Sequence, residues 1–331
     1  MHIFCFETMD WTYRIHSMKP SIISLSLVAA ASLTVAAFGQ QPQVTLFAPG
    51  PILTSALVTM SPAFAPDGKS VYLGQRASSS TNGVIMSSQQ KEGAWSAPKL
   101  APFSGRYRDL EPAFAPNGRY LIFASSRPTR YGGAELEGHY NGQLVPGDGG
   151  NLWRVERTKK GWSRPVALPS IINSNSSVFT PSITADGSLY FMRADNGASF
   201  HIYRSQMRDG KFKAPTLVSF GDPTTPNFDP MVAPDESYII FSSKRPVTAK
   251  STGLYIAFRN GTGWGDPIDL RTALSEDVHG IEARLSPDGK TLYFSNSRSS
   301  SGTDIPDGGR SHRSLRRSTC SVRTGRSATS P

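Results

Sequence analysis

Cysteines, charged residues and catalytic motifs are scarce in this chain of 331 residues. Its two cysteines, Cys5 and Cys320, lie near opposite ends, so the body of the chain depends on core burial without a disulfide. Charged residues make up 18% of the composition, and no long apolar segment with a 3.6-residue period follows residue 40, which argues against a helical fold. The histidines are isolated, no Gly-x-Ser-x-Gly sequence occurs, and the glycine-rich stretches lack a following helical pattern. We therefore expect no metal site and no cofactor.

The formal net charge of +10 is unevenly placed along the chain. Residues 299–331 hold six arginines against two aspartates, and residues 1–39 carry no net charge. The body between them carries the remaining +6 without any basic run, which is typical of a solvated surface. We therefore expect no nucleic-acid partner.

Proline and glycine are plentiful, with 25 and 30 residues, and they mark a repeat. A polar residue, a short apolar segment and a Pro-Asp-Gly-type turn recur five times, beginning at Ser61, Glu111, Thr180, Asp229 and Glu282. Each turn is followed by a run that is apolar on both faces, such as Tyr120–Phe123, then by a third extended segment, a Gly-aromatic tip and a short fourth segment. A repeat at a near-constant period indicates one supersecondary unit per copy, stacked on its neighbours.

Four short strands per unit, with middle strands buried on both faces, are typical of a β-propeller blade. We predict an all-β fold, a β-propeller of four-stranded antiparallel blades, with five blades or with six if a unit is missing at the C-terminus. The propeller is predicted over residues 40–305. Its units lie near 61–110, 111–179, 180–228, 229–281 and 282–305.

The turn sequence also resembles a known repeat. The pattern Pro-Asp-Gly-Lys-x-[Leu/Val]-Tyr-[Phe/Leu], found at Pro66–Leu73 and Pro287–Phe294, resembles the WD40-like (PD40) β-propeller repeat of TolB-type periplasmic proteins. The third unit has Ala185 in place of the turn proline and the fourth has Glu236 in place of the turn glycine, which we expect to weaken these two turns. The resemblance implies an exported, non-catalytic propeller that binds a protein or peptide across one face.

Residues 1–39 have the layout of a secretory signal peptide. A charged region begins at Met18, an apolar and small-residue stretch covers Ile22 to Val35, and the small residues Ala37 and Gly39 suit a cleavage site. Met18 is the predicted true start. We expect a periplasmic or secreted monomer that is peripheral to a membrane at most.

Both ends of the predicted ring depart from the repeat. Gln43–Leu57 resembles a fourth-strand segment with no strands before it, which predicts that an N-terminal strand completes the last blade. A third strand starts at Ser301–Ile305, but residues 306–331 lack aromatic residues and are rich in Arg, Ser, Thr and Gly. We interpret 306–331 as a disordered basic tail, of the kind a frameshift would produce, and the last blade as damaged at its third strand.

The second unit is longer than the others by about 20 residues, and the excess lies at Pro128–Gly150. This segment contains Glu135 and His139. Because long loops on rigid scaffolds often carry binding residues, it is the best candidate surface outside the repeat.

The residues that open the five first strands are the only repeated site candidates: Ser61, Glu111, Thr180, Asp229 and Glu282. The first strand of a propeller blade lines the central channel, so the three carboxylates could bind a cation or a basic peptide, or serve as acid and base. The structural alternative is that they cap backbone N–H groups or pair with an arginine of a neighbouring blade. Repeated acid–arginine pairs favour that alternative. An arginine does end every second strand: Arg76, Arg127, Arg193, Arg245 and Arg298.

Three functions remain open at this point. The first is a binding scaffold for a protein or peptide in the cell envelope. The second is a glycan-active hydrolase or lyase that uses the channel carboxylates, with carbohydrate as its ligand. The third is a truncated fragment without function. The sequence names no partner.

Overall fold

Strands account for nearly all of the regular structure. The computed structural model of the chain describes residues 2–7, 44–48, 51–53, 57–77, 80, 82–130, 132–246, 249, 251–271 and 280–296. Among the described residues, the one helix whose bounds are defined is a 3₁₀ turn, η1 (Asp195–Gly197). None of the described helical residues form a segment long and apolar enough to cross a membrane. The predicted strand at Ser301–Ile305 and the tail at 306–331 lie outside the described residues.

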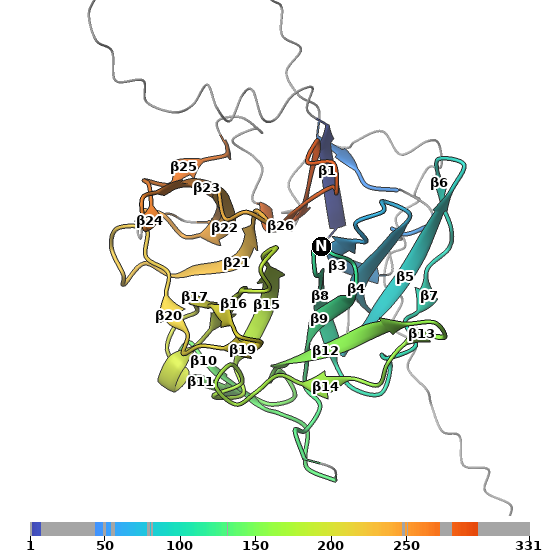
Figure 1. Cartoon of the computed structure of the whole chain (residues 1–331), viewed down its shortest axis with the longest axis horizontal. Coiled ribbons are helices and arrows are strands. Elements are labelled where there is room, and N and C mark those ends of the chain that lie inside the picture. Colours follow the sequence, from blue (N-terminus) through green and yellow to red (C-terminus); the bar gives the residue numbers. More distant parts are fainter. Residues whose placement is uncertain are drawn as a thin grey trace, which may run out of the picture. The chain divides into compact units, whose positions relative to one another are not determined.

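The strands form five antiparallel sheets of four or five strands, which confirms the predicted propeller blades (Figure 1). Blade 1 contains β3 (Leu57–Phe64), β4 (Ser70–Ala77), β5 (Gly83–Lys91), β6 (Ala94–Trp95) and β7 (Lys99–Leu100). Blade 2 contains β8 (Asp109–Phe114), β9 (Tyr120–Ser125), β12 (Asn151–Thr158), β13 (Gly161–Trp162) and β14 (Val166–Ala167). Blade 3 contains β15 (Val178–Ile183), β16 (Leu189–Arg193), β17 (His201–Ser205) and β20 (Thr216–Leu217).

Blade 4 contains β21 (Asn227–Val232), β22 (Tyr238–Ser243), β23 (Gly253–Asn260), β24 (Gly263–Trp264) and β25 (Ile268–Asp269). Blade 5 contains β26 (Gly280–Leu285), β27 (Thr291–Asn296), β1 (His2–Glu7) and β2 (Val44–Leu46). Two small hairpins are added to this plan: β10 (Gly138–Tyr140) with β11 (Gln143–Val145), and β18 (Met207–Arg208) with β19 (Lys211–Phe212).

The five first strands form a closed ring. Strand β3 contacts β8, β8 contacts β15, β15 contacts β21, β21 contacts β26, and β26 returns to β3. Figure 1 shows these strands around the centre of the molecule, with the later strands of each blade farther out. The five repeated polar residues, from here on the polar column, lie inside the first strands and not at their starts as predicted: Ser61, Glu111, Thr180, Asp229 and Glu282. The ring therefore brings them to one central channel.

The core lies between neighbouring blades. Each second strand is buried on both faces, as its apolar sequence predicted, and the aromatic side chains Phe123, Phe191, Phe241 and Phe294 are completely inaccessible to solvent. Five apolar clusters each span one blade interface. The burial of these faces replaces disulfides as the source of stability.

The turns between the first two strands have the predicted left-handed residue. Gly68, Gly118, Gly187 and Gly289 have φ between 68° and 87°, and each donates its N–H to the carbonyl three residues earlier. In the fourth unit Glu236 takes this place with φ of 57°, so the turn persists although the residue has a Cβ.

The last blade is completed by two segments from the N-terminal part of the chain. Strand β2 lies in the fourth position, which confirms the predicted closing strand. Strand β1 lies in the third position, between β27 and β2, where we had expected a damaged strand. Its register explains the fit, because Ile3 and Phe4 lie opposite Ser295 and Phe294, as Ile202 and Tyr203 lie opposite Met192 and Phe191 in blade 3. Cleavage of the predicted signal peptide, which stays a prediction, would remove β1.

Candidate functional site: the central channel

A β-bulge places the polar column in the channel. In every first strand the pairing with the second strand shifts register next to the column residue. All five column residues, Ser61, Glu111, Thr180, Asp229 and Glu282, have φ between 46° and 55° and are buried. A left-handed backbone at a non-glycine residue costs of order 1 kcal/mol and persists only where the surroundings hold it. The bulge is therefore a built feature of each blade.

Thr180 connects the two carboxylates on either side of it. Its backbone N–H donates to Glu111 Oε2 at 2.7 Å, and its hydroxyl donates to Asp229 Oδ1 at 3.2 Å. Glu111 thus caps a backbone N–H of the next blade, as the structural alternative predicted. Glu282 accepts the Ser295 hydroxyl at 2.9 Å.

Burial makes Glu111 and Asp229 reluctant to ionise. Desolvation, followed by repulsion from Glu282, raises the pKa of Glu111 to about 7. The same two causes, with repulsion from Glu111 added, raise the pKa of Asp229 to about 8. Near neutral pH, protons are therefore shared among these neighbouring acids.

Arg284 lies among the three acids, and the repeat pattern did not predict it as a site residue. Arg284 follows Glu282 by two residues, at the position occupied elsewhere by Ala63, Ala113, Ser182 and Met231. Its burial lowers its pKa, and Glu282, Asp229 and Glu111 oppose that effect. An alignment of the five copies would have shown it as the only charged residue of its column.

Two buried polar groups of the channel lack a partner within the described part of the chain. Arg284 is 8% exposed, and its Nη1 donates to the Ala283 carbonyl at 2.7 Å. Its Nη2, like the hydroxyl of the fully buried Ser61, has no hydrogen-bond partner among the described residues. Unpaired buried donors are rare because each costs roughly 1–3 kcal/mol.

A cavity of about 280 Å³ opens at the end of the channel where the first strands run into their turns. Every repeat contributes the same segment to its wall, among them Pro62, Ala113, Ile183, Met231 and Arg284. The wall is thus mainly apolar with one guanidinium.

Contrary to the predicted pairing, four of the arginines that end second strands bond groups other than the polar column: Arg76, Arg127, Arg193 and Arg245. The fifth, Arg298, lies outside the described residues. Arg127 pairs with Asp109 at 2.6 Å, and Arg245 donates to the Asn227 side chain at 3.1 Å. Both partners lie two residues before the column in the same blade. The pairing is local because each arginine lies at the outer end of the strand ladder, opposite the start of the first strand.

Among the described residues, Glu135 and His139 of the insertion at Pro128–Gly150 bond groups other than the channel carboxylates. Glu135 accepts the Ser126 hydroxyl at 2.8 Å, and exposed His139 lines a separate polar cavity of about 520 Å³. The hairpin β10–β11 docks on blade 3 through backbone bonds of Asn141 and Gly142 to residues 198 and 197. The structure therefore brings together the five column residues but not the two insertion residues.

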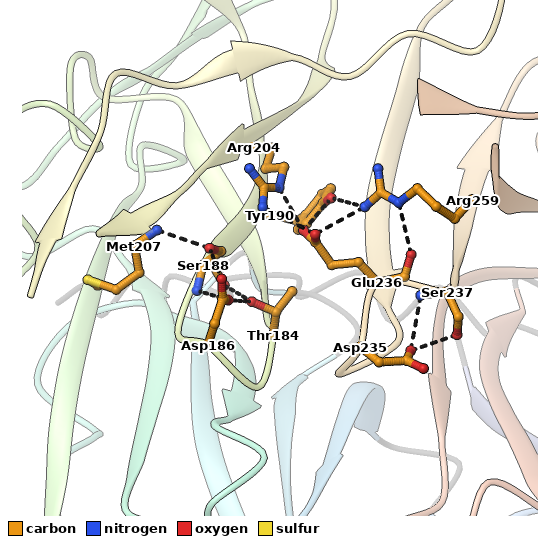
Figure 2. Close-up of polar contacts among 10 residues, drawn as sticks. All are labelled: Thr184, Asp186, Ser188, Tyr190, Arg204, Met207, Asp235, Glu236, Ser237 and Arg259. Atoms are coloured by element: carbon orange, nitrogen blue, oxygen red, sulfur yellow. Dashed lines mark hydrogen bonds and ion pairs between the residues drawn. The ribbon is translucent and has the colours of Figure 1, made fainter. Parts of the chain in front are cut away.

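A second cluster of acids and arginines joins blades 3 and 4 (Figure 2). Glu236 Oε1 accepts the Tyr190 hydroxyl at 2.8 Å and Arg204 Nε at 2.6 Å, while Oε2 lies 3.1 Å from Arg259 Nη2. Arg259 Nε also donates to the Glu236 carbonyl at 3.1 Å. The substitution that we expected only to weaken a turn links two blades instead.

No group of three His, Cys, Asp or Glu side chains suited to a metal ion occurs within the described residues. Chemically, the channel offers carboxyl groups that can exchange protons near neutral pH and one arginine with an unused donor. The cavity at its mouth offers apolar surface beside that arginine.

Comparisons with known proteins give likenesses of fold. No protein-family model matches the chain, and no curated protein matches it. Similar solved structures include TolB propellers, as the resemblance of the repeats predicted. A putative TolB from Agrobacterium tumefaciens has a TM-score of 0.45 and 15% identity, over 72% of this chain and 69% of that one.

TolB from Acinetobacter baumannii has a TM-score of 0.42 and 18% identity over 78% of this chain, which spans 57% of that protein. A thermostable family-43 glycoside hydrolase has a TM-score of 0.46 and 16% identity, over 73% of this chain and 85% of that one. The fold assignment rests on the strand topology of this chain itself.

Proposed function

We propose that this protein is an exported, non-catalytic β-propeller that binds a protein or peptide partner at the mouth of its channel. The supporting observation is the cavity to which all five repeats contribute the same apolar segment. Concave apolar surface with a few polar groups is typical of binding sites. A periplasmic or secreted location follows from the proposed signal peptide.

A charge placed in the mouth tests this function. Leu285 lines the cavity, whereas Leu217 is 42% exposed on β20, the outermost strand of blade 3. Peptides would be selected on the wild-type protein from a random 12-residue library, and their affinity measured by fluorescence anisotropy. We expect Leu285→Lys to weaken binding by about tenfold or more, because a lysine in an apolar site is poorly solvated. Leu217→Lys is the matched control and should leave the affinity unchanged. Equal affinities for both variants would reject the mouth as the binding site, provided that both keep the wild-type circular dichroism.

The glycan-cleaving alternative stays a prediction with less support. It requires a substrate to reach Glu111 and Asp229, which are 7% and 4% exposed and do not line the cavity. Hydrolysis of glycan substrates that disappears in a folded Glu111→Gln variant would favour this alternative. If the whole chain shows no cooperative unfolding transition, that result would instead favour a fragment without function.

A further inference from the structure

One of the residues that line the mouth cavity is charged. Arg284 lines it, is more than nine-tenths buried, and leaves Nη2 without a hydrogen-bond partner within the described residues. A buried guanidinium is costly unless its donors are used, and its planar fork suits the geometry of a carboxylate.

The neighbouring acids do not satisfy this arginine. Glu111 and Asp229 are bound to Thr180, and Glu282 accepts the Ser295 hydroxyl. Burial, followed by repulsion from Glu282, raises the pKa of Glu111 and of Asp229, so these two side chains carry little charge near pH 6. None of the ion pairs among the described residues includes Arg284. Glu282 acts on Arg284 through its charge but accepts no hydrogen bond from Nη2 among the described residues, so the site lacks an acceptor that an external anion would supply.

The rest of the wall defines the body attached to that anion. Ile183, Met231, Val232 and the repeated prolines line the cavity, which favours an apolar side chain next to the anionic group. A volume of about 280 Å³ is at the lower end of ligand pockets, near 300 Å³. A loop from inside a partner's chain would place two chain segments about 4.8 Å apart in the cavity, whereas a chain end would place one. The small volume therefore favours a chain end.

We propose that the mouth cavity binds the C-terminal residue of a partner polypeptide, with its α-carboxylate on Arg284 and an apolar side chain against Ile183 and Met231. This inference rests on the proposed function, because it names the part of the partner that enters the mouth. Recognition of a chain end through its carboxylate needs only a few residues of the partner.

Acetylated tetrapeptides that end in Ala, Val, Leu or Phe, each prepared as the free acid and as the C-terminal amide, test the proposal. Binding to the whole protein would be measured by calorimetry at pH 6. We expect the free acids to bind about tenfold to a hundredfold more tightly than the amides, because the charge-assisted hydrogen bond between Nη2 and the carboxylate is lost in the amide. This comparison needs no variant and so does not depend on whether a variant folds.

Two arginine variants assign the effect. Arg284→Gln should bring the acid-to-amide ratio close to one, while Arg208→Gln, at an arginine with a 71% exposed side chain, should preserve it. Equal binding of acids and amides to the wild-type protein, or an unchanged ratio in a folded Arg284→Gln variant, would overturn the proposal. If library-selected peptides bind the mouth but no tetrapeptide acid does, this inference fails and the proposed function survives. If neither kind of peptide binds, both fail.

Discussion

Two clusters of carboxylates and arginines in this molecule have opposite ratios of acid to arginine. At the junction of blades 3 and 4, Glu236 is contacted by Arg204, Arg259 and Tyr190 (Figure 2). In the channel, three carboxylates lie near Arg284, and one of its donors has no partner among the described residues. A cluster whose donors and acceptors all have partners, here called saturated, can hold blades together. A cluster with an unpaired donor, here called unsaturated, can also bind a ligand. Partner geometry, and not residue type, distinguishes a structural cluster from a binding site.

The largest expected difference between the clusters is in the pH dependence of stability. The pKa of Glu111 is raised in the folded state, so that state binds more protons than the unfolded chain and stability falls as pH rises. We expect the free energy of unfolding to fall from pH 5 to pH 8.5 by on the order of 3 kcal/mol for Glu111 alone, at 1.36 kcal/mol per pKa unit. The loss should run from the ordinary glutamate pKa up to about 7, and for Asp229 up to about 8.

Urea denaturation of the double variant Glu111→Gln/Asp229→Asn at both pH values checks this prediction. The variant should lose most of the wild-type pH slope, whereas Glu236→Gln should keep it. A double variant with the full wild-type slope would show that the channel carboxylates are not the titrating groups.

The second-largest expected effect is the loss of stability when the Glu236 carboxylate is removed. Glu236→Ala leaves two partly buried arginines and a tyrosine without their shared acceptor, and we expect a loss of about 2 kcal/mol, between exposed and fully buried pairs. The free energy of unfolding at pH 7 gives the measurement. Asp235→Ala is the matched control, since the Asp235 side chain bonds its neighbour Ser237 and no other residue that the structure describes. A loss no greater than that of the control would mean that the cluster does not join the blades.

The left-handed backbone at Glu236 provides a finer test. Glycine at this position removes the same carboxylate but relieves the unfavourable φ of 57°. We therefore expect Glu236→Gly to be more stable than Glu236→Ala by about 1 kcal/mol. Equal stability in the same denaturation experiment would show that the turn is not strained.

The smallest expected effect concerns Thr180. Thr180→Val keeps the backbone N–H bond to Glu111 and removes the hydroxyl bond to Asp229, at a cost of about 0.5–1 kcal/mol. Thermal denaturation should show a slightly lower Tm. A larger loss would mean that the hydroxyl also orders Asp229 against its other neighbours.

The repeat in the sequence predicted the blades, the left-handed turns, the closing strand β2 and the meeting of the polar column. These features follow from local patterns that occur five times. Strand β1 was not predicted, because it joins β27 from the opposite end of the chain and non-local pairing leaves no local signal. The motif His2-Ile3-Phe4, which parallels His201-Ile202-Tyr203, was the available clue.

The roles of the two clusters were also beyond the sequence. The sequence suggested arginine partners for the channel acids and a weakened turn at Glu236. In the structure Arg127 pairs with Asp109 within one blade, and Glu236 pairs with Arg259 of its own blade and with Arg204 of the neighbouring blade. Which charged groups meet depends on the packing of neighbouring blades, and the sequence of a single repeat does not determine that packing.

The protonation of Glu111 and Asp229 tests the contrast between the clusters most directly. A carbon-13 NMR titration of side-chain carboxyl groups, with Glu111→Gln and Asp229→Asn to assign the signals, would measure it. The structure predicts midpoints of about 7 for Glu111 and about 8 for Asp229. Midpoints near 4 for both, the values of exposed carboxyl groups, would contradict a buried and unsaturated channel cluster.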